Sequence, residues 1–214
     1  MHDAVRLFSR RHESYVRFIR AVRYPQGIRA FLLSSPLLRS DLRVLDAGCG
    51  TGVVTLALRE ALLRRGLRPG TLHAFDLTPI MLERFRRTLR EQNIAVDLTQ
   101  ADVLELDALP ASWASYDLVV SASMLEYLSP TQLVAGLSGL RRLLGPGGTF
   151  LLFITRRNWL TRPFIGAWWR SNLYDADELR RAFLGAGFTS IVFRRFPAPF
   201  RHFALWGHIV EAHP

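Results

Sequence analysis

One nine-residue run constrains the fold more than any other part of the chain: Val44-Leu45-Asp46-Ala47-Gly48-Cys49-Gly50-Thr51-Gly52. Two apolar residues lead into an acid, three glycines then alternate with other residues, and an apolar helical pattern begins at Val53. Because glycine lacks a Cβ atom, it permits unusual backbone angles and lets another molecule approach the main chain. The helix that follows would present free N–H groups in its first turn. The run therefore predicts a buried strand that ends at a ligand-binding turn.

Strand and helix patterns alternate from this run onward. We expect strands over residues 43–46, 71–75, 94–99, 116–122 and 149–154, separated by helices over 53–65, 79–92 and 130–144. A further helix over 175–184 is followed by two expected strands, over 189–196 and 206–212. Such alternation predicts a parallel α/β sheet with helices on both faces and right-handed crossovers.

Three acids follow three successive expected strands: Asp46, Asp76 and Asp102. In an open α/β sheet, ligands bind outside the carboxyl ends of the strands. One acid at such an end is often a helix cap, but three in line with the glycine turn favour a common ligand.

The run Asp-x-Gly-x-Gly-x-Gly and the three acids resemble the class I S-adenosylmethionine (SAM)-dependent methyltransferases of the small-molecule and lipid type. The spacing differs from the G-x-G-x-x-G of dinucleotide-binding proteins. The resemblance implies a doubly wound, mostly parallel seven-stranded sheet with helices on both faces and a C-terminal antiparallel hairpin. It places this domain at residues 41–214, behind an N-terminal helical lid over 1–40.

The resemblance also implies SAM as cofactor, with S-adenosylhomocysteine as product, and a residue for each part of it. Asp46 would orient the methionine end, Asp76 would accept hydrogen bonds from both ribose hydroxyls, and Asp102 would recognise adenine together with the backbone of Val103. Expected neighbours of the cofactor are Gly48, Cys49, Gly50, Leu77 and Ser121. We expect no metal site.

An amphipathic helix is expected over residues 2–24, followed by a break at 24–27 and a short helix over 28–33. In proteins of the resembling family such helices cover the cofactor, and Tyr15 would then lie nearest to it. Two alternatives remain open: packing against the edge of the sheet, and a basic helix that lies on a membrane.

Methyl transfer from a sulfonium is a direct displacement, so alignment of the acceptor can supply most of the acceleration. No residue must therefore be catalytic, and Tyr127 and Tyr15 are weak candidates. In part of the resembling family a histidine that acts as a base occupies the position of Tyr127. A packing or substrate-contact role for Tyr127 is the alternative.

Residues 155–174, after the fifth expected strand, combine aromatic side chains with arginines. We expect this insertion to cover the substrate, and its candidate substrate-binding residues are Trp159, Trp168, Trp169 and Tyr174, together with Tyr15 and Tyr127. Aromatic rings beside cations suit an apolar acceptor with an acidic group, or a membrane surface. An ordinary helix whose tryptophans fill the core is the alternative.

The net charge of +10 comes entirely from arginine, since the chain contains no lysine. Such a charge suits nucleic acid, an anionic membrane or an acidic substrate. The chain lacks the Asn/Asp-Pro-Pro-aromatic motif of base-amino methylases and a paired-glutamate loop, and its one cysteine lies in the glycine turn. We therefore expect a small, largely apolar acceptor such as a quinone or lipid precursor. An RNA-directed methyltransferase and a non-catalytic SAM-binding protein remain as alternatives.

The single Cys49 fits an intracellular protein, and no apolar run approaches the roughly 18 residues that span a bilayer. We expect a cytoplasmic protein that can contact the inner membrane face peripherally.

Overall fold

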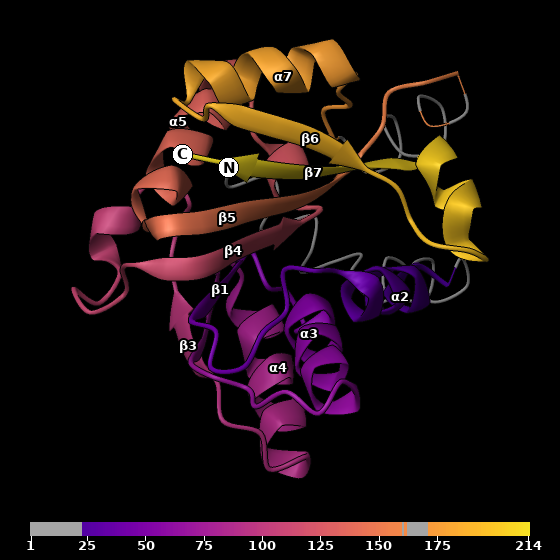
Figure 1. Cartoon of the computed structure of the whole chain (residues 1–214). Coiled ribbons are helices and arrows are strands. Elements are labelled where there is room, and N and C mark those ends of the chain that lie inside the picture. The colour runs from indigo at the N-terminus through magenta and orange to yellow at the C-terminus, as the bar shows by residue number, and fades with distance from the viewer. Residues whose placement is uncertain (1–22, 160, 162–170) are drawn as a thin grey trace.

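The computed structural model describes residues 23–159, 161 and 171–214. Figure 1 shows a central twisted sheet between two groups of helices. The helices are α2 (Tyr24–Ser34), α3 (Val53–Arg64), α4 (Pro79–Glu91), α5 (Pro130–Arg142) and α7 (Ala176–Gly185), with short 3₁₀ helices η1 (Leu106–Ala108), η2 (Leu125–Tyr127) and η4 (Phe200–Leu205). The strands are β1 (Val44–Ala47), β2 (Leu72–Asp76), β3 (Asp97–Gln100), β4 (Tyr116–Ala122), β5 (Leu144–Thr155), β6 (Ser190–Arg194) and β7 (Gly207–His213).

Within the described residues the strands form one sheet in the order β3-β2-β1-β4-β5-β7-β6. β3, β2, β1, β4 and β5 pair in parallel, whereas β7 is antiparallel to both β5 and β6. The mostly parallel seven-stranded sheet and the C-terminal antiparallel hairpin are therefore confirmed. All five parallel strands end at the same edge of the sheet.

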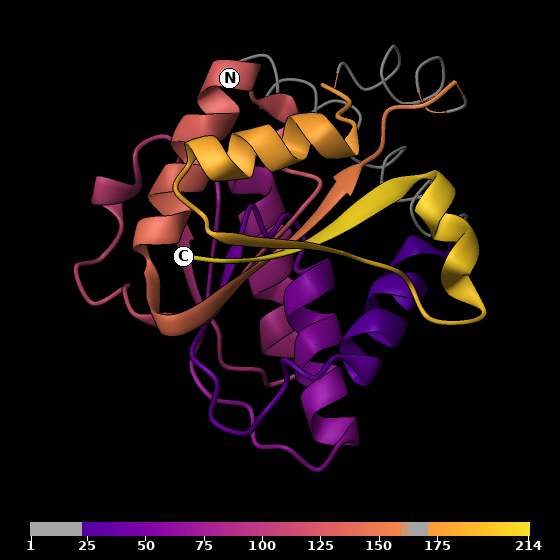
Figure 2. The ribbon, with the colours of Figure 1, turned by 45° about the horizontal axis from the view of Figure 1, so that its top comes forward.

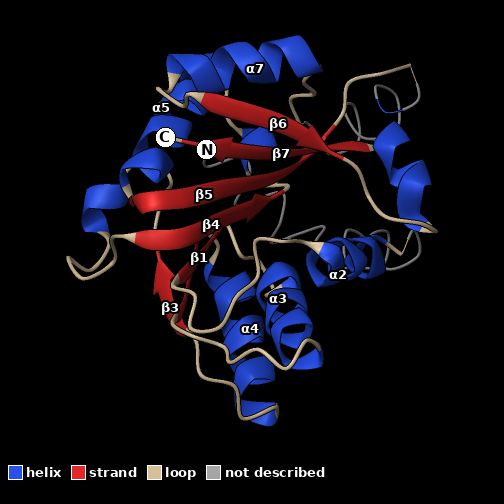
Figure 3. Ribbon diagram, in the orientation of Figure 1, coloured by secondary structure: helices blue, strands red, loops and turns tan. Residues whose placement is uncertain are grey.

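Each face of the sheet is covered by its own helices, which Figure 3 shows in blue on either side of the red strands. One apolar cluster packs α2 and α3 on β1, β4, β5 and β7, and a smaller one adds α4 beside β2. The cluster on the other face includes α5 and α7. This double covering explains why the middle strands are apolar on both faces.

Helix starts follow the local sequence. Ser129 and Asp175 open α5 and α7 with capping boxes to Gln132 and Glu178, and Pro130 occupies the first turn of α5. Thr78 precedes Pro79 at the start of α4 as expected, but its hydroxyl makes no cap bond. Its N–H instead donates to Asp76 Oδ1 at 2.8 Å, which ties the helix start to the end of β2.

The break expected at residues 24–27 is wrong, because α2 begins at Tyr24 and runs through Pro25 and Gly27. Proline is tolerated in a first helical turn, where its missing N–H would have no partner within the helix. Gly27 is buried, and a Cβ atom there would lie 2.6 Å from the Phe203 ring. The glycine therefore serves close packing of α2 on η4, as Figure 2 shows at the indigo and yellow segments.

β5 begins at Leu144, five residues before the expected strand over 149–154. Tyr116 pairs with Leu144 and the register then shifts, so that Leu118 pairs with Thr149. Residues 145–148 form a bulged part of the strand. A Cβ atom at Gly148 would lie 2.5 Å from the Tyr116 carbonyl oxygen, which explains a glycine at this close crossing.

The expected division at residues 40/41 stays a prediction. The described part of 1–40 includes α2, which packs on α3 and η4, while residues 1–22 and Tyr15 lie outside the described residues. None of the helices in the described ranges is long and apolar enough to cross a membrane.

Candidate cofactor-binding site

The glycine turn after β1 is fixed to the next strand by its backbone. The N–H groups of Gly48 and Cys49 both donate to the Phe75 carbonyl oxygen at 2.9 Å, and Gly52 N–H donates to Cys49 O at 2.8 Å. Gly48, Gly50 and Gly52 have φ angles of 74°, 52° and 84°. These are left-handed conformations that favour glycine over other residues.

The three glycines meet different surroundings. A Cβ atom at Gly48 would lie 2.4 Å from Met124 Cγ, and one at Gly52 would lie 2.1 Å from the Phe85 ring. At Gly50 no atom of the described residues other than its two chain neighbours lies within 4 Å of the Cβ position. Gly48 and Gly52 therefore allow the turn to pack against the protein, whereas Gly50 faces open space where another molecule can approach.

Asp46 lies at the end of β1 with its side chain buried. Its Oδ2 accepts hydrogen bonds from Thr55 N–H at 3.1 Å and from Thr55 Oγ1 at 2.5 Å, while its buried Oδ1 has no partner among the described residues. Burial raises the pKa of Asp46 to about 7, against the lowering effect of the Thr55 bonds. A half-satisfied buried carboxylate is costly for folding alone, which indicates a ligand for the second oxygen.

Asp76 is the last residue of β2, and its carboxylate contacts the same glycine turn. Its Oδ2 accepts from Gly50 N–H at 2.8 Å, and its Oδ1 accepts from Thr78 N–H at 2.8 Å. Burial raises the pKa of Asp76 above its ordinary value, although these two bonds act in the opposite direction. The carboxylate is thus held in one orientation beside the open position at Gly50.

Asp102 and Val103 follow β3, the edge strand beside β2. Ala101 N–H donates to Asp76 O at 3.2 Å, and Asp102 lies two residues beyond Gln100, the last paired residue of β3. Asp102 Oδ1 accepts from Leu104 N–H at 2.8 Å, and Val103 is buried in the core. The three acids therefore lie along one edge of the sheet, at the ends of β1, β2 and β3. Leu77 is half-buried next to Asp76, and its carbonyl accepts from Gln100 Nε2 at 3.2 Å.

Ser121 lies near the end of β4, opposite Ala47 of β1. Its side chain is fully buried and its Oγ has no partner among the described residues. Ser123 then takes a left-handed backbone conformation with φ 55°, and its N–H donates to Phe153 O at 2.9 Å. This turn brings Met124 against Gly48, so the exit of β4 forms one wall of the glycine turn.

Cys49 is buried within the turn. Burial raises the pKa of its thiol well above the ordinary value, and the nearby carboxylates of Asp46 and Asp76 act in the same direction. Since the thiolate is the nucleophilic form, Cys49 contributes backbone geometry here and no covalent chemistry.

Two residues of this region were not among the sequence predictions. Thr55, in the first turn of α3, holds Asp46, and its position just past the glycine turn was the available signal. Glu126 is buried in η2, where its Oε2 accepts from Thr155 N–H at 2.9 Å and its carbonyl accepts from Asn172 N–H at 2.7 Å. Burial raises the pKa of Glu126. Glu126 therefore joins the exits of β4 and β5 to residue 172, within the expected substrate cover over 155–174.

The expected substrate residues that the structure describes differ in exposure. Tyr127 is half-buried in η2, and Trp159 is almost fully exposed beyond β5. Tyr174 is buried, and its hydroxyl donates to Leu128 O at 3.1 Å, so its position indicates packing within the core rather than an open acceptor surface. Tyr15, Trp168 and Trp169 lie outside the described residues. The described residues contain no group of histidine, cysteine and carboxylate side chains able to hold a metal ion.

Residues 44–148 match the family model described as a methyltransferase domain. This range includes β1 to β4, the glycine turn and the three acids. The chain carries a methyltransferase domain. Its fold is that of the class I methyltransferases, as the glycine turn and the three acids implied.

Named relatives match between about half and three fifths of the chain. A carboxy-S-adenosyl-L-methionine synthase from Stutzerimonas stutzeri is 31% identical over 122 residues, covering 56% of this chain and 48% of the relative. The uncharacterized methyltransferase YodH of Bacillus subtilis is 35% identical over 111 residues, covering 52% of this chain and 42% of the relative. This chain thus matches about half the length of these relatives.

A solved structure extends the likeness of the fold beyond the matched domain. Magnesium protoporphyrin IX methyltransferase from Synechocystis PCC 6803, crystallised with bound S-adenosylhomocysteine, superimposes with a TM-score of 0.65 at 20% identity. The superposition covers 89% of this chain and 81% of that protein. At this identity the likeness concerns the fold, which includes the C-terminal hairpin.

Proposed function

We propose that this protein is a SAM-dependent methyltransferase that transfers a methyl group by direct displacement to a small, largely apolar acceptor. One observation carries the proposal: two strand-end carboxylates flank a glycine turn whose middle glycine faces open space. Asp46 contributes a buried oxygen without a partner, and Asp76 is held beside Gly50. The match of residues 44–148 to a methyltransferase domain supports the same cofactor.

The polar groups around the turn fit SAM. Each carboxylate oxygen has more than one lone pair, so Asp76 can keep its bonds from Gly50 and Thr78 and still accept from two ribose hydroxyls. The unpaired Oδ1 of Asp46 suits the amino end of the methionine group, directly or through water. Asp102 and Val103 would meet the adenine at the next strand end, and Ser121 would lie near the amine.

Bound SAM supplies the methyl group as part of a sulfonium. The residues of this chain would then align the acceptor and exclude water, which can provide most of the acceleration. Cys49 is buried and protonated, and Glu126 already accepts a backbone hydrogen bond, so neither is placed as a free base. Tyr127, in η2 just past the β4 exit, remains the candidate for contact with the acceptor.

The acceptor side of the protein favours an apolar molecule. Residues 144–174 contain no acidic side chain but include three tryptophans, Trp159, Trp168 and Trp169. Aromatic side chains bury large apolar areas, so a quinone- or lipid-like acceptor fits better than a polar one. The cytoplasmic location expected from the sequence belongs to this proposal.

The relatives by themselves do not identify the transferred group, because they include both a carboxy-SAM synthase and a methyltransferase. Direct displacement of a methyl group is therefore tested by the product. We would incubate the purified protein with a cell extract and SAM labelled in its methyl group, and analyse the extract by mass spectrometry.

We expect S-adenosylhomocysteine together with one labelled apolar small molecule. Asp76→Asn should abolish both products, while the exposed Asp107→Asn in η1 should leave them unchanged. Label found only in RNA would support an RNA-directed enzyme instead. Bound SAM without S-adenosylhomocysteine would indicate a non-catalytic SAM-binding protein, and a carboxylated cofactor would indicate synthase chemistry.

A further inference from the structure

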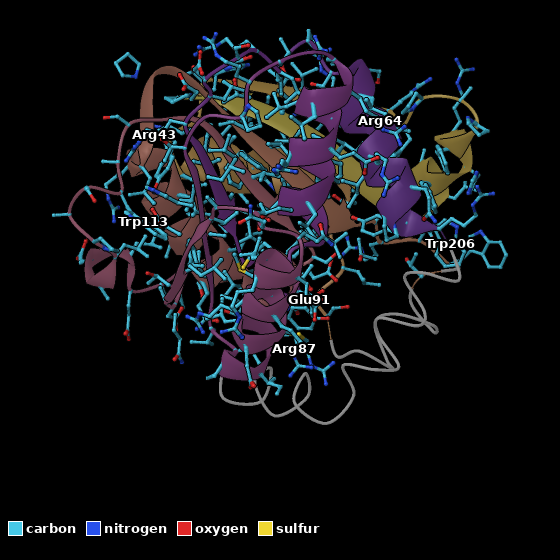
Figure 4. The ribbon with its side chains drawn as sticks, turned by 90° about the horizontal axis from the view of Figure 1, so that it is seen from below. Arg43, Arg64, Arg87, Glu91, Trp113 and Trp206 are labelled. Atoms are coloured by element: carbon cyan, nitrogen blue, oxygen red, sulfur yellow. The ribbon has the colours of Figure 1, made fainter. Side chains whose placement is uncertain are left out.

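Two large apolar side chains lie exposed beyond the carboxyl end of β5. Trp159 is 85% exposed and Leu205, at the end of η4, is 58% exposed. Asn158 Nδ2 donates to Leu205 O at 2.5 Å, and Arg156 N–H donates to Trp206 O at 2.9 Å. The segment 156–159 and the end of η4 are therefore joined, and each carries one exposed apolar side chain. Figure 4 shows Trp206 at the margin of the molecule beside η4.

Aromatic contacts hold η4 against the rest of the protein. Phe203 is buried, stacks on Phe200 with ring centroids 5.9 Å apart, and meets Tyr24 and Phe196 edge-on at 6.0 and 5.3 Å. The absence of a side chain at Gly27 allows α2 to approach the Phe203 ring. These contacts fix the position of η4, and Leu205 at its end is exposed.

Three arginines contribute positive charge to the region around η4. Arg23, Arg156 and Arg201 are exposed and form no ion pair with any described acid. Arg23 instead lies over the Phe200 ring at 6.0 Å, and Arg156 donates to Ala204 O at 3.2 Å. Two other arginines of the segments around η4 are ion-paired: Arg157 with Asp175 and Glu178, and Arg194 with Glu211.

The segments that build this region carry no negative charge. Residues 23–40, 144–174 and 194–210 contain neither aspartate nor glutamate. Within these segments no acid balances the charge of Arg23, Arg156 and Arg201, which favours the approach of anions.

We propose that η4 and residues 156–159 form a surface that docks on an anionic lipid bilayer. Tryptophan and arginine both settle at the boundary between lipid and water, and an exposed leucine gains by entering the hydrocarbon. Unpaired arginines are attracted to anionic headgroups. RNA would also attract the arginines and could stack a base on Trp159, but the exposed aliphatic Leu205 gains only by entering an apolar phase, which favours the bilayer.

The position of this surface connects it with the candidate site. Thr155, the last residue of β5, pairs with Gly207, the first residue of β7, so η4 precedes β7 at the carboxyl edge of β5. The Asp46 turn lies at the same edge of the sheet, beyond β4. A bilayer at η4 would thus lie on the side of the molecule where the cofactor is expected. Docking itself does not depend on methyl transfer.

Flotation of the full-length protein with vesicles tests the proposal. We expect it to float with phosphatidylcholine–phosphatidylglycerol vesicles at low salt and to remain in solution with phosphatidylcholine alone. The variant that combines Trp159→Ala, Leu205→Ser and Arg201→Gln should lose flotation. Each arginine near an anionic surface contributes a change of about fivefold in partitioning, and the two apolar side chains add to it.

A matched control substitutes the same kinds of side chain on α7, which lies on the other face of the sheet. Leu184 is 54% exposed and Arg181 is exposed on the same helix. Leu184→Ser with Arg181→Gln should float like the unchanged protein, and all variants should keep the melting temperature. Absence of flotation, or flotation of the triple variant at the unchanged level, would overturn the proposal. Salt-sensitive RNA binding without flotation would assign the surface to nucleic acid and overturn it as well.

Discussion

Asp46 is buried in a way that costs free energy, and a ligand at the candidate site would explain this cost. Its carboxylate is buried at the end of β1 and accepts two bonds from Thr55 through one oxygen, leaving the other without a partner. Burial raises its pKa from 3.8 to about 7. Proteins retain such costly groups at functional positions more often than elsewhere.

The raised pKa of Asp46 predicts a pH dependence of stability. Between about pH 4 and about pH 7 the folded protein holds a proton on Asp46 that the unfolded chain has released, so stability falls as pH rises through this window. The shift corresponds to roughly 4 kcal/mol at most. In Asp46→Asn this loss should disappear, so the variant should gain stability relative to the unchanged protein as pH rises.

Urea unfolding of both proteins at about pH 5 and about pH 8 measures this difference. Asp76 and Glu126 also have raised pKa values and change the slope in both proteins alike. Only the difference between the two curves therefore reports on Asp46. Parallel curves would contradict a buried, half-paired Asp46.

Gly50 and Gly52 provide a second comparison at the residue scale. Alanine at Gly52 would place its Cβ 2.1 Å from the Phe85 ring at a φ of 84°, so Gly52→Ala should cost roughly 3–5 kcal/mol from clash and strain together. Gly50→Ala meets no atom and should cost about 1–2 kcal/mol for its positive φ. We expect Gly50→Ala to weaken SAM binding at least about tenfold, because its Cβ fills the approach to the turn.

Urea unfolding and calorimetric titration with SAM separate these two effects. Equal losses of stability in the two variants, or normal SAM binding by Gly50→Ala, would contradict the division of roles in the turn.

Single residues could be predicted where local sequence determines their position. Asp46 and Asp76 lie at strand ends because an apolar run stops at each acid. The division of labour among the glycines could not be predicted, since it depends on Met124 and Phe85, which come from distant parts of the chain. From the sequence Tyr174 was expected to cover the substrate. Its burial could not be predicted, because its hydroxyl bonds to the carbonyl of Leu128, which is distant in the chain.

At the scale of elements, α2 is part of the core. Its buried Phe31 meets Phe153 of β5 edge-on at 5.5 Å and Phe196 at 6.4 Å. Arg29 also pairs with Glu60 of α3 at 2.9 Å. The helix therefore completes one face of the sheet.

Phe31→Ala should accordingly destabilise the protein by about 3–5 kcal/mol, the usual cost of truncating a buried aromatic ring. The half-exposed Leu63→Ala at the end of α3 serves as control and should change stability by less than about 1 kcal/mol. Thermal and urea unfolding measure both. If the two variants unfold alike, α2 contributes as little as a detachable lid would.

Strongly periodic elements were predicted to within a few residues, as for β4 over 116–122 and α5 from Pro130. The start of α2 and the start of β5 were wrong, because proline and glycine normally end elements. Tertiary contacts explain both exceptions. In α2 the Phe203 ring packs against Gly27, and in β5 the Tyr116 carbonyl lies close to Gly148. η2 and η4 give no periodic signal at their lengths.

At the scale of the molecule, the strand order explains why the candidate site could be predicted in outline. Parallel neighbours β3, β2, β1 and β4 end at one edge, so acids that follow successive strands meet there. The acceptor side follows no such rule. It depends on the exits of β4 and β5, on η4 and on insertions whose contacts are set by tertiary packing.

The central claim is that Asp76 and the glycine turn bind SAM, and calorimetric titration with SAM tests it most directly. We predict one binding site in the unchanged protein and the same affinity in Asp107→Asn. Asp76→Asn should bind about 10- to 150-fold more weakly, because a hydrogen bond to a charged group contributes about 1.5–3 kcal/mol. If a folded Asp76→Asn, judged by circular dichroism, binds SAM as tightly as the unchanged protein, the site has been placed wrongly.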